Sequence, residues 1–418
     1  MRNVILQQRI ERDRLCSLEY QRRKVNVNVE DYLKSPLIKL IQGPRRAGKS
    51  VLALQILMGN KFAYLDFDDN KLLDRFDEDL VMQVLSEVYP DYKYLLLDEI
   101  QNLDGWELWV SKLYRRGVNI IITGSNAHLL SSDLSTSLSG RFLSIEILPF
   151  SFEETCDYLN IEGNIDNPQQ KGAFMYQAEE YARNGGFPEI IKTRNLTEAY
   201  LQGVYDTVIL KDIIQRYKIR NVSDLYNIAE WLISNFTNQF TISSLKEELG
   251  FASKNTLANF CRYLENSYMF FYLPRFNNKL KIMKKAASKV YVVDNGFIKA
   301  KAFSVSDNIG RLLENMVFVE LVRRGYAAGK TLFYYRSSND REVDFVTRKG
   351  NKVECLIQVC YDMSSPSTQA REFKALQECG KELHCSKFEV VTWDSQQTIL
   401  LADNEVSVVP FYKWVASK

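Results

Sequence analysis

Several features that often carry chemistry are scarce in this sequence. His128 and His384 are the only histidines, which removes most histidine-based metal and acid–base sites. The seven cysteines are odd in number and include no C-x-x-C pair, so neither a zinc site nor a disulfide scaffold is expected. No uncharged apolar run approaches about 18 residues, and residues 1–23 lack the apolar segment of a signal peptide. We therefore expect a cytoplasmic protein in a reducing compartment, without a membrane partner.

A strong net charge is also absent. The formal charge is +2 over 418 residues, so no global field attracts nucleic acid or membranes, and any basic surface must be local. The composition, 46% hydrophobic and 25% charged, is that of an ordinary globular protein. The length suffices for about two to four domains.

The most informative segment is a G-x-x-x-x-G-K-S pattern between a short apolar run and a helical pattern. Gly43 and Gly48 would let the backbone turn its N–H groups toward phosphates, and a helix beginning near Lys49 would point its positive end at them. Lys49 would reach the β- and γ-phosphates, and Ser50 would take one Mg²⁺ position. The predicted nucleotide-binding residues are Gly43, Pro44, Arg45, Arg46, Ala47, Gly48, Lys49, Ser50 and Val51.

Two acidic residues form the second half of the predicted site. Asp98 and Glu99 follow an apolar run at residues 94–97, about fifty residues after Lys49. Asp98 would supply a carboxylate to Mg²⁺ at the end of a buried strand. Glu99 would orient and deprotonate the attacking water. The alternative is a solvated acidic pair that caps the strand.

Asn126 and Arg141 are two further catalytic candidates. Asn126 follows the next apolar run and would hold the water near the γ-phosphate, or would only form an Asx-type turn. Arg141 would stabilise charge on the γ-phosphate, either on its own subunit's nucleotide or on a neighbour's. Its alternative role is a surface or interdomain salt bridge.

Apolar runs near residues 39–42, 61–67, 94–97, 118–123 and 142–148 alternate with helical patterns. Continuous apolar strands separated by helices are typical of a parallel sheet covered on both faces, so the fold class is α/β. Gly, Asn, Pro and Gln replace the apolar pattern at residues 160–172, which predicts a linker or domain boundary. A helical pattern follows to about residue 220, broken at residues 184–188, and the chain becomes β-rich after residue 290.

The ordered motifs resemble those of one group of proteins. Gly-Pro-Arg-Arg-Ala-Gly-Lys-Ser, Leu-Leu-Leu-Asp-Glu-Ile-Gln, Thr-Gly-Ser-Asn and Leu-Ser-Gly-Arg-Phe are similar to those of prokaryotic AAA-superfamily P-loop ATPases with a C-terminal domain of unknown function. The resemblance continues at residues 185–189 and 210–213 and covers nearly the whole chain. It implies an AAA-type ATPase core at 1–160, a helical lid at 173–225, a winged-helix segment at 226–290 and a restriction-endonuclease-like domain at 291–418.

The residues themselves also predict a helix–turn–helix. A short helix from Thr241 stops at Gly250, and Ser253 caps a longer helix over residues 254–266. The apolar face of that longer helix is Leu257, Phe260, Cys261 and Leu264. A basic run without acids then contains Arg275, Lys279, Lys281, Lys284, Lys285 and Lys289. This run would suit the phosphates of double-stranded DNA, although such helices also serve as packing modules and lysine-rich runs as solvated faces.

The last domain resembles a PD-(D/E)xK nuclease that has lost key residues. Glu314 and Asp344 match the opening of such a core, but Gln358 stands at the position of the second acid and Cys360 at that of the lysine. An amide is a weaker Mg²⁺ ligand, and a thiol cannot replace a cationic amine. Glu354 shares the face of Gln358 but lies too far along the strand. We therefore expect an inactive nuclease fold used for binding, with Cys360 as a buried strand residue.

Together these patterns predict a Mg²⁺-dependent ATPase, with ATP and Mg²⁺ as cofactors, whose nucleotide state controls binding of DNA or a protein partner. The alternatives are a nucleotide-gated scaffold with negligible turnover and an ATP-regulated nuclease. A role for Arg141 at a neighbour's nucleotide would require a homo-oligomer.

Overall fold

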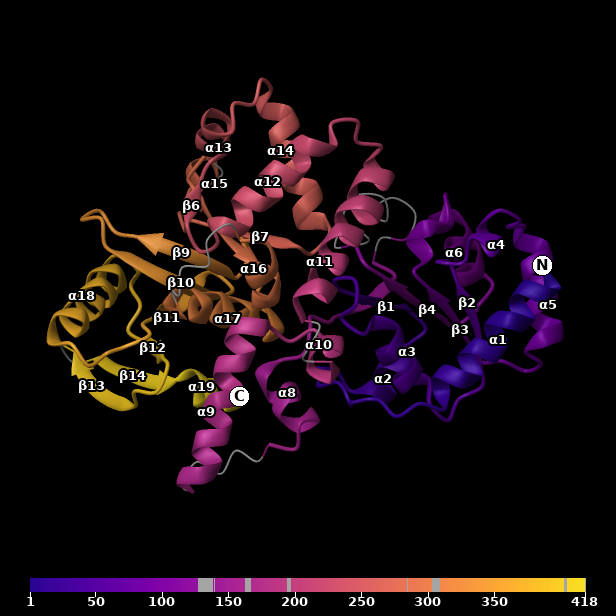
Figure 1. Ribbon diagram of the computed structural model, residues 1–418, viewed down its shortest axis with the longest axis horizontal. Helices are drawn as coiled ribbons and strands as arrows, with labels where there is room; N and C mark the ends of the chain where they lie inside the picture. The colour runs from indigo at the N-terminus through magenta and orange to yellow at the C-terminus, as the bar shows by residue number, and fades with distance from the viewer. Residues whose placement is uncertain are drawn as a thin grey trace. The chain divides into compact units, whose positions relative to one another are not determined.

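The computed structural model describes residues 1–126, 138, 140–161, 167–193, 197–283, 285–302, 309–401 and 404–417. The chain divides into two units, each with its own core (Figure 1). Unit 1 contains Met1–Leu148 and Asn266–Tyr268. Unit 2 contains Pro149–Glu265 and Met269–Lys418. Of the described helices, none is long and apolar enough to cross a bilayer.

Unit 1 is organised around a parallel sheet. Its strands, within the described residues, are β1 (Ile38–Gln42), β2 (Phe62–Asp66), β3 (Tyr94–Asp98), β4 (Ile120–Gly124) and β5 (Phe142–Glu146). Their order in the sheet is β2–β3–β4–β1–β5, and every neighbouring pair is parallel. The apolar runs in the sequence thus correctly predicted a parallel sheet.

Helices cover both faces of this sheet. They are α1 (Arg2–Cys16), α2 (Val29–Lys34), α3 (Lys49–Leu57), α4 (Asn70–Leu73), α5 (Glu78–Val88), η1 (Ile100–Asn102) and α6 (Trp106–Arg115). Leu40 and Leu97 belong to one buried core, and their neighbours Ile41 and Leu96 belong to a second. Because successive strand residues point to opposite faces, this alternation places one core on each side of the sheet.

Unit 2 begins with a short helix after Pro149. Helix α8 (Phe152–Tyr158) starts with a reciprocal capping box between Ser151 and Glu154, and it packs against α9 (Pro168–Asn184) and α19 (Phe411–Ala416). Residues 149–160, predicted to belong to the ATPase core, therefore lie in unit 2. The predicted linker at residues 160–172 overlaps the start of α9, where the Asn167 side chain caps the helix.

The predicted helical region after α9 is present. It contains α10 (Pro188–Lys192), α11 (Thr197–Thr207), the π-helix η4 (Val208–Gln215) and α12 (Val222–Ser234). The chain leaves helical geometry between α9 and α10, where Gly185 has a φ of +78°. The break predicted at residues 184–188 is therefore confirmed.

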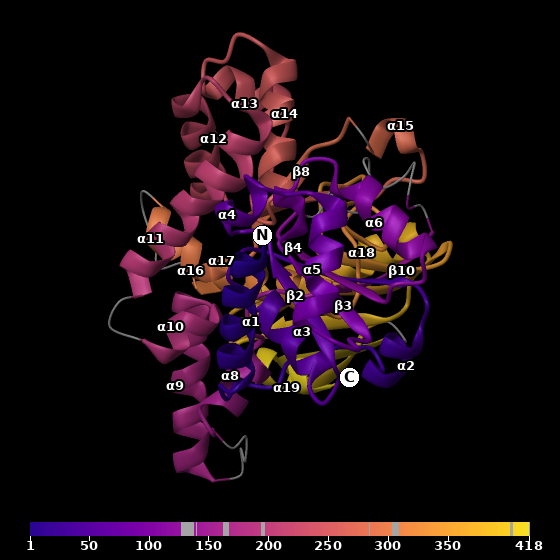
Figure 2. The ribbon, with the colours of Figure 1, turned by 90° about the vertical axis from the view of Figure 1, so that its right-hand side faces the viewer.

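Three helices and a small antiparallel sheet follow. The helices α13 (Ile242–Glu248) and α14 (Lys254–Asn266) lie beside α12 (Figure 2). The Ser253 hydroxyl caps α14 by accepting a bond from the Thr256 N–H at 3.3 Å, as predicted. Among the described residues the sheet order is β6 (Gln239–Phe240), β8 (Ser288–Val292), β7 (Phe270–Pro274), with α15 (Leu280–Met283) between β7 and β8. The domain division predicted between residues 290 and 291 falls inside β8.

A mixed sheet completes unit 2. In the part of the chain that the structure describes, its order is β13–β14–β12–β11–β10–β9. The strands are β9 (Leu332–Arg336), β10 (Glu342–Lys349), β11 (Lys352–Val359), β12 (Phe388–Thr392), β13 (Gln397–Leu401) and β14 (Asn404–Pro410). Helices α16 (Asn295–Lys301) and α17 (Ile309–Arg323) precede it, and α18 (Pro366–Leu383) follows β11. The β-rich pattern predicted after residue 290 therefore begins only at Leu332.

Candidate nucleotide site

The phosphate loop joins β1 to the N-terminus of α3. Gly43 has a φ of +152°, and a Cβ atom at this position would lie 1.9 Å from the carbonyl oxygen of Ile147. Gly48 is the N-cap of α3 and has a φ of +92°. Glycine is therefore required at both positions, once by close packing and once by backbone conformation. The N–H groups of α3 are left at the mouth of the loop, as phosphate binding requires.

A buried arginine that the sequence analysis overlooked supports this loop. The Arg23 guanidinium donates from Nη1 to the carbonyl oxygen of Ala47 at 2.5 Å. It also donates from Nη2 to the carbonyl oxygen of Leu148 at 2.7 Å. The loop is thus fixed by a charge-assisted bond from the segment between α1 and α2.

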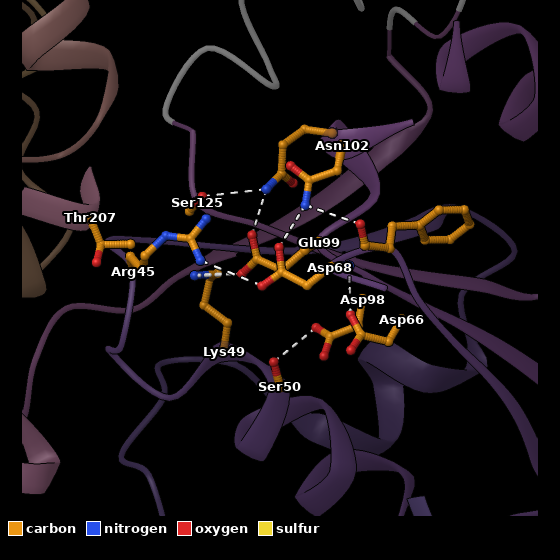
Figure 3. Close-up of polar contacts among 12 residues, drawn as sticks. Arg45, Lys49, Ser50, Asp66, Asp68, Asp98, Glu99, Asn102, Ser125 and Thr207 are labelled. Carbon is orange, nitrogen blue, oxygen red and sulfur yellow. Dashed lines mark hydrogen bonds and ion pairs between the residues drawn. The ribbon is translucent and has the colours of Figure 1, made fainter. Parts of the chain in front are cut away.

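Asp98 receives hydrogen bonds from three hydroxyl groups, of which that of Ser50 is drawn in Figure 3. Ser50 Oγ donates to Asp98 Oδ1 at 2.8 Å, and the Thr123 hydroxyl donates to the same oxygen. The Tyr64 hydroxyl donates to Oδ2 at 3.2 Å. Burial and the neighbouring Glu99 raise the pKa of Asp98, whereas the two bonds from Thr123 and Ser50 and the charge of Lys49 oppose this shift. Ser50 and Asp98, the predicted Mg²⁺ ligands, are therefore brought together.

Lys49 and Glu99 form a buried ion pair. The distance from Lys49 Nζ to Glu99 Oε1 is 3.1 Å, and Nζ also donates to the carbonyl oxygen of Pro44 at 3.2 Å. Burial alone would raise the pKa of Glu99, but the charges of Lys49 and Arg45 outweigh it and lower the pKa to about 2. Glu99 is thus ionised at neutral pH, and its partner is the amine predicted to bind phosphate.

The backbone of Glu99 is in an uncommon conformation. Its φ of +50° places it in the left-handed region, which costs a non-glycine residue about 1–3 kcal/mol. The side chain is held by Gln101, whose amide donates to Glu99 Oε2 and, at 3.3 Å, to Ser125 Oγ. At the end of β4, Thr123 Oγ1 accepts a bond from the Glu99 N–H at 3.0 Å, and Ser125 is linked to Glu99 through Gln101. Asn126 follows Ser125 and is buried, and its predicted contact with water remains a prediction.

Further polar contacts lie around the Lys49–Glu99 ion pair. Arg45 Nη1 lies 3.5 Å from Asp68 Oδ2, and Asn102 donates to Asp68 Oδ1 at 2.8 Å (Figure 3). The Asp68 N–H in turn donates to Asp66 Oδ1 at 2.9 Å. Burial, together with the charges of Asp98 and Asp68, raises the pKa of Asp66 to about 7, against the bond from Asp68. These residues form a continuous polar shell that only the folded arrangement reveals.

Arg141 lies at the amino ends of the strands, whereas the phosphate loop follows the carboxyl end of β1. Phe142, the first residue of β5, pairs with Ile38, the first residue of β1, and the Ile38 N–H donates to the carbonyl oxygen of Arg141 at 2.9 Å. The phosphate loop begins at Gly43, five residues after Ile38. A strand rises about 3.3 Å per residue, so roughly 16 Å separate the backbone of Ile38, beside Arg141, from the start of the loop. The Arg141 guanidinium lies 5.6 Å from the centroid of the Tyr114 ring. The predicted action of Arg141, on its own subunit's nucleotide or on a neighbour's, remains a prediction.

The residues present fit a nucleotide phosphate with Mg²⁺. Gly43 and Gly48 let the backbone approach a phosphate without a Cβ atom, and Lys49 adds a cation at the loop. Ser50 and Asp98 place two adjacent oxygens at one side of it. Mg²⁺ commonly takes one or two protein oxygens and completes its shell with waters and phosphate oxygens. These residues would therefore hold both groups.

The predicted DNA-contacting run is only partly on the surface. Lys279, Lys281 and Lys285 are exposed, and Lys284 lies outside the described residues. Lys289, in contrast, is buried, and its Nζ lies 3.0 Å from Glu314, 2.8 Å from Glu342 and 2.9 Å from Asp344. These carboxylates raise the pKa of Lys289 well above its ordinary value, although burial opposes them. The prediction that Lys289 contacts DNA is therefore wrong.

The same cluster contains the residues predicted for the nuclease-like core. The Asp344 N–H donates to Gln358 Oε1 at 3.3 Å, and Gln358 Nε2 donates to Glu372 Oε2 at 2.7 Å. Cys360 is buried, as predicted, and burial raises the pKa of its thiol to about 11. Among the described residues, no group of three His, Cys, Asp or Glu side chains is arranged to hold a metal ion. The ammonium of Lys289 contacts Asp344, and the guanidinium of Arg371 contacts Glu372.

Comparisons with known proteins place these observations in a family. Residues 35–156 match a family described as an AAA domain, and residues 175–307 and 309–414 match two domains of unknown function. An uncharacterized protein of Methanocaldococcus jannaschii is 34% identical over 409 residues, which cover 93% of this chain and 90% of that protein. The chain belongs to this family of AAA-domain proteins. Unit 1 is accordingly a nucleotide-binding P-loop domain.

Other similar proteins are known. An uncharacterized protein of Haemophilus influenzae is 32% identical over 366 residues, covering 81% of this chain and 88% of that protein. Among solved structures, the Walker-type ATPase PABY2304 of Pyrococcus abyssi is 17% identical, with a TM-score of 0.44. That alignment covers 68% of this chain and 99% of the Pyrococcus chain.

We predict that the stability of this AAA-domain protein depends on the ionisation of Asp66. Because the folded state raises the pKa of Asp66 from 3.8 to about 7, it binds the proton more tightly than the unfolded chain does. The contribution of Asp66 to the free energy of unfolding is fully present below about pH 4 and is lost as the pH rises toward 7. The free energy of unfolding falls over this range by at most about 1.4 kcal/mol per pH unit. The Asp66→Asn variant keeps the acceptor for the Asp68 N–H and should lack this dependence. Urea unfolding of both proteins at pH 5 and pH 8 measures the difference, and parallel losses in the two proteins would contradict the assignment.

Proposed function

We propose that this protein is a Mg²⁺-dependent ATPase whose nucleotide state controls its binding of DNA or a protein partner. The observation that carries the proposal is the convergence of two segments, the phosphate loop with α3 and the end of β3. Lys49 contacts Glu99, and Ser50 contacts Asp98, at distances of 3.1 and 2.8 Å. A phosphate-binding lysine, a pair of magnesium ligands and a buried carboxylate are the parts that hydrolysis of a phosphoanhydride requires.

Glu99 is proposed as the base that takes the proton of the attacking water. Its pKa of about 2 is too low for efficient proton abstraction while Lys49 is paired with it. When Lys49 binds phosphate instead, the largest charge that lowers this pKa moves away. Burial then raises the pKa of Glu99, which makes it a stronger base. Mg²⁺ at Ser50 and Asp98 would neutralise charge on the β- and γ-phosphate oxygens.

A nucleotide-gated scaffold with negligible turnover is the second candidate. The buried Lys49–Glu99 pair favours it, because phosphate binding must break a contact in a region of low dielectric. Both candidates predict that ATP binds. They differ in whether bound ATP is hydrolysed.

Replacement of Lys49 or Glu99 separates binding from turnover. Lys49→Ala should weaken ATP binding at least about tenfold, because a charge-assisted phosphate contact is lost. Glu99→Gln should bind ATP normally and lose at least about 100-fold in kcat, because the amide cannot accept the proton. Calorimetric titration with ATP and steady-state phosphate release measure the two quantities.

Lys71→Ala and Glu87→Gln are the matched controls, since both side chains are exposed in unit 1 and neither belongs to the site. Both should behave like the unmodified protein. Normal turnover by Glu99→Gln would remove Glu99 as the base, and ATP binding without hydrolysis by the unmodified protein would favour the scaffold.

Arg141 is proposed to act on the nucleotide of a neighbouring subunit. Arg141 directly precedes β5, and roughly 16 Å of strand separates this position from its own phosphate loop, which favours presentation of the nucleotide by a second copy. Such an arginine stabilises charge that spreads over the transferred phosphoryl group. This proposal requires a homo-oligomer.

Mixing two inactive variants tests the action of Arg141 between subunits. Arg141→Ala keeps the phosphate loop, and Lys49→Ala keeps Arg141. Each should hydrolyse ATP at least about tenfold more slowly than the unmodified protein, and a mixture should regain part of the activity at mixed interfaces. Phosphate release is measured at several total protein concentrations. A mixture no more active than the sum of its components would contradict the proposal.

DNA is proposed as the partner on unit 2. The order α13, α14, β7, β8 supports the winged-helix interpretation, and the exposed lysines around α15 supply positive charge beside it. Leu280 and Ile282 are exposed on the same short helix. A protein partner is the alternative that these apolar side chains favour.

Charge reversal around α15 distinguishes the two partners. The triple variant Lys279→Glu, Lys281→Glu, Lys285→Glu should weaken binding to a DNA duplex and reduce the salt slope of log K by up to about three. The matched control reverses three exposed lysines elsewhere in unit 2, Lys349, Lys352 and Lys381. Fluorescence anisotropy over a salt series measures both. Equal DNA binding by the two triple variants would exclude α15 from the interface.

Nuclease activity is not part of the proposal. The candidate metal position near Asp344 has Gln358 in place of an acid, and the Lys289 ammonium is bonded there. An ammonium in contact with three carboxylates disfavours a divalent cation at the same place by charge repulsion. The region is therefore proposed to bind or to support binding without cleaving.

A further inference from the structure

Unit 1 contains a cavity of about 520 Å³ that is separate from the nucleotide site. Its walls come from the C-terminal half of α1, the end of α3, the start of β2 and the end of α5. Lys49 begins α3 and Leu57 ends it, so at about 1.5 Å per residue the cavity lies roughly 12 Å along the helix from the phosphate-binding lysine. The cavity therefore lies toward the amino ends of the strands, whereas the phosphate loop lies at their carboxyl ends.

The walls of the cavity are mainly apolar. Four aromatic rings line it, those of Tyr20, Phe62, Tyr89 and Tyr92. Apolar side chains such as Leu15, Leu57 and Met58 also line it, and Met58 is 65% exposed. Cavities of about 300–1,000 Å³ with aromatic walls and a few polar groups are typical of sites for small organic ligands.

The charges at this cavity are unequal. Arg9, Arg12 and Lys61 line it, whereas Asp13 is its one acidic lining residue among the described residues. The balance is therefore +2. A site of this charge selects an anion over a neutral or cationic compound.

One arginine is built into the wall, and the other two cations are nearer to solvent. Arg12 lies over two rings, 5.0 Å from the centroid of Phe62 and 4.9 Å from that of Tyr89, and donates to the carbonyl oxygen of Phe62 at 2.6 Å. Arg9 donates to the carbonyl oxygen of Val88 at 2.7 Å and is exposed, as is Lys61. Arg12 therefore orders the aromatic wall, and Arg9 and Lys61 are accessible to an incoming ligand.

We propose that this cavity binds a small organic anion with an aromatic body. The rings of Phe62, Tyr89 and Tyr92 would contact the body, and Arg9 and Lys61 would pair with a carboxylate, phosphate or sulfonate group. The size of the cavity limits the ligand to a small molecule. This proposal does not depend on ATP hydrolysis.

Anilinonaphthalene sulfonate, an aromatic anion whose fluorescence rises in apolar surroundings, is the probe for this site. The unmodified protein should bind it saturably, and an excess of ATP with Mg²⁺ should not displace it. The double variant Arg9→Glu, Lys61→Glu should bind it at least about tenfold more weakly, because like charges then face the sulfonate. The same variant should bind the uncharged analogue phenylnaphthylamine within about twofold of the unmodified protein.

Two further variants locate the probe. Met58→Trp enlarges a side chain at the rim of the cavity and should weaken both compounds. Lys71→Glu, an exposed charge reversal outside the cavity, should change neither. Circular dichroism and the thermal midpoint establish that each variant is folded. Unsaturable binding, full displacement by ATP, or equal sulfonate binding by the Arg9→Glu, Lys61→Glu variant would each overturn the proposal.

Discussion

The buried carboxylate of Asp98 is the point on which the nucleotide-binding unit depends. A buried carboxylate is costly unless hydrogen bonds compensate it, and Asp98 receives them from Ser50, Tyr64 and Thr123. These hydroxyls come from α3, β2 and β4. One charge therefore joins the helix after the phosphate loop to two strands of the sheet. The arrangement also explains why the predicted magnesium ligands are already in contact.

Each unit contains a buried lysine that is paired with carboxylates, Lys49 in unit 1 and Lys289 in unit 2. The two lysines differ in the number of carboxylates that they contact. Lys49 faces one carboxylate, Glu99, at the end of a loop that is shaped for phosphate. Lys289 contacts three carboxylates within the interior of unit 2. A phosphate can compete for Lys49, because its several oxygens offer more negative charge than Glu99 does. The contacts of Lys289 join β8 to α17 and β10.

The sequence predicted features whose causes are local. The glycines at positions 43 and 48, the apolar strands and the Ser253 cap follow from short patterns, and the structure contains them. Arg23 and Lys289 could not be assigned in this way, because their partners lie far along the chain. Arg23 bonds to Leu148, and Lys289 bonds to Asp344. A run of lysines predicts a solvated face, and the burial of Lys289 among acids overrides that expectation. The strand order, which no local pattern contains, decides the position of Arg141.

The small segment Asn266–Tyr268 has a consequence for the gene as well as for the protein. Its three side chains are buried, and it belongs to unit 1 although more than a hundred residues separate it from Leu148. The polypeptide therefore passes between the two units three times. A recombination event or an expression fragment that ended at Leu148 would leave out these three buried residues of unit 1. An expression fragment of the nucleotide-binding unit would therefore need residues 266–268 in addition to residues 1–148 to keep the contacts of the unit.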